Sequence, residues 1–169
     1  KGVRVATSAT GLKYKGRDDL LICDLVEGTT VAGTFTRSKT CSAPVDWCKK
    51  ALAGGAARGL IVNAGNANAF TGKAGCAVVE TCISAVADQL SCRPSRVFCA
   101  STGVIGVQLP TDAIISHIGS AWAQMQDSNS TVCSKAANAT MTTDPFAKAA
   151  GCAAKTGDAA VHIAGIANG

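Results

Sequence analysis

Two short segments that consist only of apolar residues constrain the fold of this chain most. Residues 60–62 (LIV) and 97–100 (VFCA) contain no polar side chain, and such runs are typical of strands buried on both faces. The segment between them predicts a helix over about residues 74–90, because apolar side chains recur every three or four positions, at Val79, Ile83, Val86 and Leu90. A strand, a helix and a strand therefore follow one another at the centre of the chain.

Alternating and β-branched residues predict further strands near the start of the chain. Residues 3–6 alternate in polarity, residues 20–26 form an apolar run broken by Asp24, and residues 31–36 are rich in β-branched side chains. Because Gly28-Thr29-Thr30 separates the last two segments, we expect them to pair as a hairpin. Ala43-Pro44 is expected to end this extended region.

The remaining segments favour helices and one late strand. Helices are predicted over residues 45–52, from Pro110-Thr111-Asp112 onward, and over about 131–141, with Pro145 as a breaker. Residues 160–167 alternate weakly and predict a strand. The fold class is therefore α/β (mixed α+β), a layered sandwich of sheets and helices, and residues 1–169 are expected to form one incomplete domain.

Composition disfavours some classes of function but does not identify the function. Only 16% of the residues are charged although 47% are hydrophobic, with a net charge of +5. Either a partner subunit covers an apolar surface, or the chain is a globule rich in small residues. Lysines and arginines are scattered, with no basic block interleaved with aromatics, which disfavours nucleic-acid binding. No apolar run reaches the length of a membrane-spanning helix, so no membrane association is expected.

The nine cysteines and two histidines do not predict a metal site. No two cysteines have the C-x-x-C spacing, and His117 and His162 lie far apart in the sequence. Free thiols on apolar faces instead indicate a reducing, intracellular location. We expect a cytoplasmic protein, or one of the mitochondrial matrix if the source is eukaryotic.

The polar loop after the first buried strand resembles a phosphate-binding loop only in its context. Six residues separate Gly65 from Gly72, and Ala74 follows Lys73 where a P-loop needs a hydroxyl. This spacing disfavours nucleotide binding. The loop is then either a turn that uses the tolerance of glycine and asparagine for left-handed backbone, or a set of amides that faces a polar ligand.

Two later segments carry hydroxyl groups but no nucleophile with a base. Residues 101–106 (STGVIG) follow the second buried strand, where exposed N–H groups in a glycine-containing turn can stabilise an oxyanion. Residues 141–145 (MTTDP) end a predicted helix. From the spacing alone, an ordinary turn in the first case and a helix end in the second are the favoured explanations. Neither the cysteines nor the histidines form a Ser-His-Asp or Cys-His arrangement.

Taken together, six long motifs in the same order resemble the ornithine acetyltransferase family. They are residues 13–20 (KYKGRDDL), 30–36 (TVAGTFT), 42–48 (SAPVDWC), 62–72 (VNAGNANAFTG), 100–106 (ASTGVIG) and 141–144 (MTTD). They spread over nearly the whole chain.

This resemblance implies an enzyme with no cofactor that moves an acetyl group from N2-acetyl-L-ornithine to L-glutamate in arginine biosynthesis. The family is made as a precursor that cleaves itself before a threonine, which becomes the nucleophile at the N-terminus of the β chain. Our chain would be the α chain of an α2β2 assembly. The predicted strand at residues 160–167 nearly reaches the last residue, which fits a chain continued elsewhere. Acetyl-CoA as a further acetyl donor is left open.

Carried over residue by residue, Thr102 and Gly103 would form the oxyanion hole. One threonine of the pair Thr142 and Thr143 would bind substrate, and Asn66 and Asn68 would lie near the site. Asn168 stands where the family has a lysine that contacts substrate. Because a neutral amide replaces a charge-assisted contact there, we expect weaker binding of the substrate carboxylate.

Two other functions remain as alternatives. Self-processing aminopeptidases of similar architecture hydrolyse an acyl intermediate instead of transferring it. A non-catalytic partner subunit would share the fold without the reaction.

Overall fold

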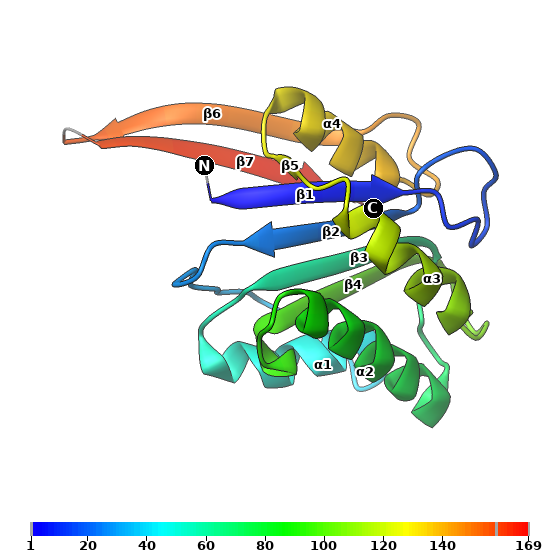
Figure 1. Cartoon of the computed structure of the whole chain (residues 1–169). Coiled ribbons are helices and arrows are strands. Elements are labelled where there is room, and N and C mark those ends of the chain that lie inside the picture. The colour runs from blue at the N-terminus through cyan, green and yellow to red at the C-terminus, as the bar shows by residue number, and fades with distance from the viewer. Residues whose placement is uncertain (1, 158, 169) are drawn as a thin grey trace.

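The computed structural model describes residues 2–157 and 159–168. Its strands are β1 (Val3–Ser8), β2 (Leu20–Leu25), β3 (Gly59–Asn66), β4 (Val97–Val104), β5 (Gln126–Asp127), β6 (Lys148–Thr156) and β7 (Ala159–Ala167). Its α-helices are α1 (Ala43–Ala51), α2 (Gly72–Gln89), α3 (Thr111–Trp122) and α4 (Ser130–Ala139). Figure 1 shows sheets and helices in layers, which confirms the predicted fold class.

The main sheet has five strands in the order β4-β3-β2-β1-β5. β1 pairs antiparallel with β2 and β5, and β2 pairs antiparallel with β3. β3 and β4 are parallel over eight paired positions, from Gly59 opposite Val97 to Asn66 opposite Val104, with α2 as the crossover between them. The carboxyl ends of β3 and β4 therefore lie side by side.

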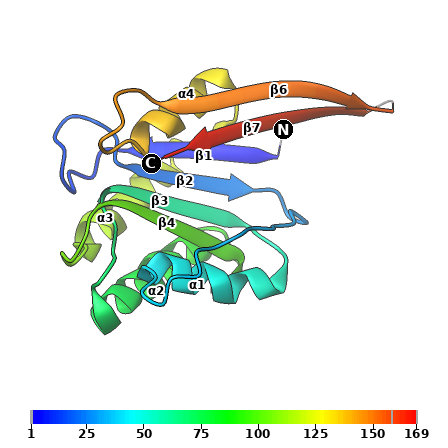
Figure 2. The ribbon, with the colours of Figure 1, turned by 180° about the vertical axis from the view of Figure 1, so that it is seen from behind.

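Alternating side chains of β1 and β2 build a core on each face of the sheet. Ala6, Leu20 and Ile22 pack with buried residues of α2 and α3 on one face. Val5 and Leu21, one position away, pack with Val132 and Ala136 of α4 on the other face. This is the two-residue period of a strand. It places α4 on the opposite side of the sheet from α2 and α3, as the two views of Figures 1 and 2 show.

Helix α1 covers the edge strand β4. Its first turn holds Pro44, where the missing N–H of proline is tolerated. The indole N–H of Trp47 donates to the carbonyl of Val97 at 2.9 Å. A third core cluster joins Cys48 and Ala51 of this helix to Phe98 of β4. The helix predicted over residues 45–52 is thus confirmed, and it begins two residues earlier than expected, at Ala43.

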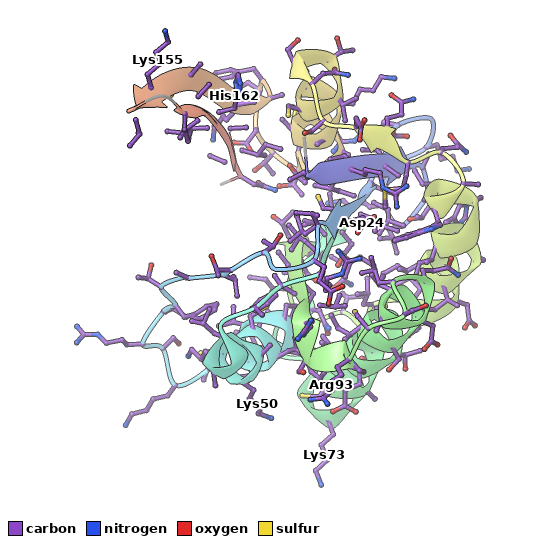
Figure 3. The ribbon with its side chains drawn as sticks, turned by 60° about the vertical axis from the view of Figure 1, so that its left-hand side comes forward. Asp24, Lys50, Lys73, Arg93, Lys155 and His162 are labelled. Carbon is purple, nitrogen blue, oxygen red and sulfur yellow. The ribbon has the colours of Figure 1, made fainter. Side chains whose placement is uncertain are left out.

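The hairpin of β6 and β7 lies apart from the main sheet (Figures 1 and 2). Every described residue of β7 is exposed, and β6 is exposed except at its first residue. Its apolar side chains Val161, Ile163 and Ile166 are 42%, 55% and 42% exposed. In Figure 3 Lys155 and His162 stand on the hairpin, clear of the sheet. This chain therefore does not bury the apolar residues of its hairpin.

One expectation about strands is corrected by the structure, and the strand β6 was not predicted. Residues 31–36 form no strand, because β1 and β3 occupy both edges of β2 and leave none for a local hairpin. That region makes only a short bridge between Thr30 and Ala56. In addition, β6 did not show in the sequence, since alanine and glycine give it no alternating pattern. The other predicted helices and strands are confirmed, with boundaries moved by a few residues.

No helix within the described residues has both the length and the apolar character needed to cross a membrane.

The contrast between core and hairpin makes a prediction about stability. Ile83→Ala removes a side chain that is 0% exposed, and we expect it to lower the free energy of unfolding by about 2–5 kcal/mol. Ile163→Ala, the matched change on the hairpin, should cost less than about 0.5 kcal/mol in the chain by itself. Urea denaturation of both variants measures this, and equal losses would show that the hairpin packs on the sheet.

Candidate active site

The candidate site lies at the carboxyl ends of β3 and β4. In sheets with parallel strands, ligands commonly bind at this edge, where the following turns diverge. The turn after β3 (residues 66–72) and the turn after β4 (residues 104–109) are tied together by hydrogen bonds. The N–H of Gly106 donates to the carbonyl of Ala69 at 2.9 Å, and the side-chain amide of Asn66 donates to the carbonyl of Val107 at 3.0 Å. The two turns therefore form one rigid rim.

Gly103 brings the backbones of β3 and β4 into close contact at this rim. It pairs with Gly65 and has φ +129°, a region that L side chains rarely adopt. A Cβ atom at position 103 would lie 2.4 Å from the carbonyl carbon of Gly65. Glycine at position 103 is therefore a steric requirement of the rim.

The N–H of Gly103 points away from β3. The N–H of Cys99 donates outward to the thiol of Cys48 on α1, at 3.4 Å. Because N–H groups of a strand alternate in direction, those of Ser101 and Gly103 face the same outer side. The N–H of Ala67, just after β3, donates to the carbonyl of Val104 at 2.8 Å, so the even-numbered residues of β4 bond to β3 and Gly103 does not. Because β4 is the edge strand, no other strand of the described sheet faces the N–H of Gly103.

Thr102 and its neighbour Ser101 face opposite sides of the sheet. Ser101 donates to Oδ1 of Asn63 at 2.6 Å on the side of α2. Thr102 lies opposite Ala64 on the other face and is half-buried. Within the described part of the chain its hydroxyl has no hydrogen-bond partner. A free hydroxyl and a free N–H on adjacent residues are suitable donors for the oxygen of a polarised carbonyl.

Asn66 and Asn68 hold the rim together from inside. Both are buried, and Asn68, at 0% exposure, has a left-handed backbone with φ 45°. Its side chain donates to the carbonyl of Gly75 at 3.0 Å and accepts from the hydroxyl of Thr71 at 2.7 Å. Asn66 accepts from the N–H of Asn68 at 2.8 Å. The structure gives both amides intramolecular partners, and a direct contact with substrate stays a prediction.

The other predicted site residues form a second group. Thr142 is half-buried and Thr143 is exposed, just after α4. Asn168 lies beside them in space, because its side-chain amide donates to the carbonyl of Thr140. The structure thus brings Asn168, just after β7, to Thr140, at the start of the segment that carries Thr142 and Thr143.

The 9–19 loop, which connects β1 to β2, joins the two groups. On one side Lys13 lies against Gly65, since a Cβ on that glycine would be 2.9 Å from Cβ of Lys13. On the other side the Tyr14 hydroxyl donates to the carbonyl of Thr142 at 3.3 Å, and Arg17 donates to the carbonyl of Met141. In Figure 1 this loop lies at the same end of the sheet as the rim.

Asp19 fixes the shape of this loop. It is 0% exposed and accepts from the N–H and hydroxyl of Thr10, both at 2.7 Å, and from the N–H of Leu12 at 2.9 Å. Three charge-assisted bonds compensate for the burial of one carboxylate. Sequence reasoning assigned no role to Asp19, and the available signal was an acidic residue directly before the apolar run of β2.

The cysteines near the site are not suitable nucleophiles. A hydrogen bond with the Cys48 thiol, together with burial, raises the pKa of Cys99 far above its usual range, so this thiol stays protonated. Burial raises the pKa of Cys82 to about 11. Hydrogen bonding to Cys99 lowers the pKa of Cys48 to about 7, but its side chain is only 6% exposed. Within the described residues no group of three His, Cys, Asp or Glu side chains is placed to hold a metal ion.

Comparison with known proteins gives matches along nearly the whole chain. Residues 4–169 match the ArgJ family. The arginine biosynthesis bifunctional protein ArgJ of Gluconobacter oxydans is 47% identical over 99% of this chain, and the protein of the same name from Bradyrhizobium diazoefficiens is 45% identical over 99%. The chain spans 39% and 40% of the length of these two relatives.

Two crystal structures share the fold. The arginine biosynthesis bifunctional protein ArgJ of Bacillus halodurans superposes with a TM-score of 0.90 and 29% identity, covering 100% of this chain and 87% of the other. The ornithine acetyltransferase of Mycobacterium tuberculosis, solved in complex with ornithine, gives a TM-score of 0.85 and 33% identity, covering 99% and 88%. The crystallised chains are therefore much shorter than the curated relatives.

The amide network predicts that Asn68 is needed for folding. Asn68→Ala leaves the carbonyl of Gly75 and the hydroxyl of Thr71 without their buried partner, so we expect a loss of about 2–4 kcal/mol in the free energy of unfolding. Asn138→Ala is the control, because Asn138 is exposed and bonds only within its own helix. Chemical denaturation compares the two, and an unchanged Asn68→Ala would contradict the network.

Proposed function

Because this chain belongs to the ArgJ family, we propose that it is the α chain of an ornithine acetyltransferase, which transfers an acetyl group from N2-acetyl-L-ornithine to L-glutamate. One observation supports this most strongly. Thr102 and Gly103 present a hydroxyl and an N–H that are free of β3, at the carboxyl end of a parallel strand pair. These donors suit the carbonyl oxygen of an acetyl group.

The proposed reaction uses a threonine of a second chain as nucleophile. Its hydroxyl adds to the acetyl carbonyl of N-acetylornithine while its own α-amine takes the proton. Thr102 and Gly103 stabilise the negative oxygen of the tetrahedral intermediate. The carbon–nitrogen bond then breaks, ornithine leaves with the proton, and an acetyl ester remains. The amine of glutamate attacks this ester, the threonine hydroxyl is released, and N-acetylglutamate forms.

The exposed hairpin supports a second chain. Three large apolar side chains on β7 are about half exposed, although burying such a side chain is worth about 1.5–3 kcal/mol. The curated relatives are more than twice as long as this chain, whereas the crystallised chains are of similar length. A precursor cut in two would produce this pattern. In our proposal the β chain covers the hairpin, and two α and two β chains assemble.

The rest of the site would hold the substrate. The 140–143 segment lies where the 9–19 loop reaches across from the rim, so Thr142 or Thr143 would contact the amino-acid part of the substrate. Asn66 and Asn68 would act by fixing the turn that supports Gly103. No cofactor enters the proposed mechanism. Because the relatives are described as bifunctional, acetyl-CoA is proposed as an additional donor.

The proposed function predicts that the Thr102 hydroxyl acts in catalysis. In the complete protein, made of this chain and its β chain, Thr102→Val should lower kcat by about 100- to 1000-fold, because one oxyanion donor is lost. Thr102→Ser keeps the hydroxyl and should retain most of the rate. Acetylglutamate formation from acetylornithine and glutamate measures this. Equal rates for Thr102→Val and Thr102→Ser would show that the Thr102 hydroxyl does not act in the oxyanion hole. Release of free acetate instead of acetylglutamate would indicate a hydrolase.

A second prediction concerns Asn168. Asn168→Lys places a cation beside the carbonyl of Thr140, next to the proposed substrate segment. We expect it to lower the KM for acetylornithine by about tenfold, as expected for one charge-assisted contact. Asn138→Lys, an exposed change on α4, is the control for added positive charge. An unchanged KM in Asn168→Lys would show that this position does not contact the substrate carboxylate.

A further inference from the structure

We propose that Lys13 binds the α-carboxylate that acetylornithine and glutamate have in common, and so determines the specificity of the site for amino acids. The inference rests on the proposed function, and it gives the 9–19 loop a role in substrate recognition. Three observations support it: where the side chain begins, where its ammonium lies, and which charges are already paired.

The side chain of Lys13 begins at the rim. Gly65 has φ +113°, and a Cβ on it would approach Cβ of Lys13 to 2.9 Å and the N of Lys13 to 3.6 Å. Gly65 is the residue that pairs with Gly103. Gly65 therefore lies between Lys13 and Gly103 at the end of β3.

The ammonium of Lys13 lies toward the second group of site residues. Its Nζ is 5.5 Å from the ring centre of Tyr14. The hydroxyl of that tyrosine bonds the carbonyl of Thr142 at 3.3 Å. The flexible stem of the lysine thus runs from Gly65 to the neighbourhood of the Tyr14 ring, and carries a point charge there.

No acidic group of the described chain neutralises this charge. Lys13 is exposed, and no described carboxylate lies within ion-pair distance of it. Asp19 is buried and accepts hydrogen bonds from Thr10 and Leu12, and Asp144 pairs with Lys148 at 2.5 Å. Of the two other cations of the loop, Arg17 is stacked on Tyr14 and bonded to the carbonyl of Met141, whereas Lys15 is exposed and makes no ion pair with a described carboxylate. Lys13 and Lys15 are therefore the two cations of this loop without an ion pair to a described carboxylate, and Lys13 is the one whose side chain begins against Gly65.

The chemistry of the substrates places a carboxylate near the proposed oxyanion donors. In both substrates the α-carboxylate is on the same carbon as the nitrogen that carries or receives the acetyl group. When the acetyl oxygen lies at Thr102 and Gly103, the carboxylate must lie close to them too. The side chains of ornithine and glutamate differ in charge, so a cation near the reacting carbonyl recognises only the part that both share.

The test compares Lys13→Met, Lys13→Arg and Lys15→Met in the complete protein. Methionine keeps an unbranched stem without the charge, arginine keeps the charge, and Lys15 is an exposed lysine of the same loop. We expect Lys13→Met to lower kcat/KM about tenfold or more for acetylornithine and for glutamate, with most of the change in KM. Lys13→Arg should recover most of the loss, and Lys15→Met should stay within about twofold of wild type.

A donor without the carboxylate separates recognition from a structural role. With N-acetylputrescine, which is acetylornithine lacking the α-carboxylate, wild type and Lys13→Met should be equally poor. An equal loss in Lys13→Met for both donors, or no loss for either, would overturn the proposal. If wild type transfers no acetyl group, the proposed function fails. Calorimetric titration of both donors then tests the role of Lys13 independently of the reaction. Wild type that binds acetylornithine more tightly than N-acetylputrescine, with this preference lost in Lys13→Met, supports the proposal. No binding of either donor, or an unchanged preference in Lys13→Met, refutes the proposal.

Discussion

The contact between the backbones of Gly65 and Gly103 is the constraint on which the rest of the site depends. It allows two parallel strands to end at the same level without a side chain between them. Because β4 is an edge strand, its outer N–H groups stay free of the sheet. The amides of Asn66 and Asn68 then lock the turns that follow, so the free donors at Thr102 and Gly103 belong to a rigid frame. Preorganised donors of this kind cost little reorganisation when charge develops on a carbonyl.

The sequence predicts this frame well because its signals are local. The apolar runs of β3 and β4 and the periodic stripe of α2 each depend on neighbouring residues, and the structure confirms all three. The sequence does not predict which strands pair along the two edges of a given strand. The segment 31–36 has the composition of a strand, yet β1 and β3 already flank β2, and this competition is settled only in three dimensions. The hairpin strand β6 escapes prediction for a related reason, since its small side chains are not sorted between a core and a solvent face.

In the candidate site, too, features set by neighbouring residues can be predicted from the sequence, whereas contacts between distant residues cannot. The turn after β4 can be recognised from its glycines and its position after a buried strand. The link from Lys13 to Gly65 and from Tyr14 to Thr142 joins residues far apart in the chain, and no local pattern reveals it. Asp19 acts through the backbone of its own loop, so its importance appears only once the loop is seen to be closed around a buried carboxylate. The exposed apolar side chains of β7 fit a second chain that covers them. The cysteine with the lowered pKa, Cys48, is buried, and the pKa values of Cys82 and Cys99 are raised, so the proposed nucleophile is assigned to that second chain.

The central claim is that this chain polarises the acetyl carbonyl while a threonine of another chain attacks it. Intact-mass and peptide mass spectrometry of the complete protein, quenched after addition of acetylornithine without glutamate, test it most directly. The account predicts two polypeptides, with the mass of one acetyl group added to the N-terminal threonine of the second and none added to this chain. An acetyl group on a residue of this chain, or acetyl transfer by a preparation that contains no second polypeptide, would contradict it.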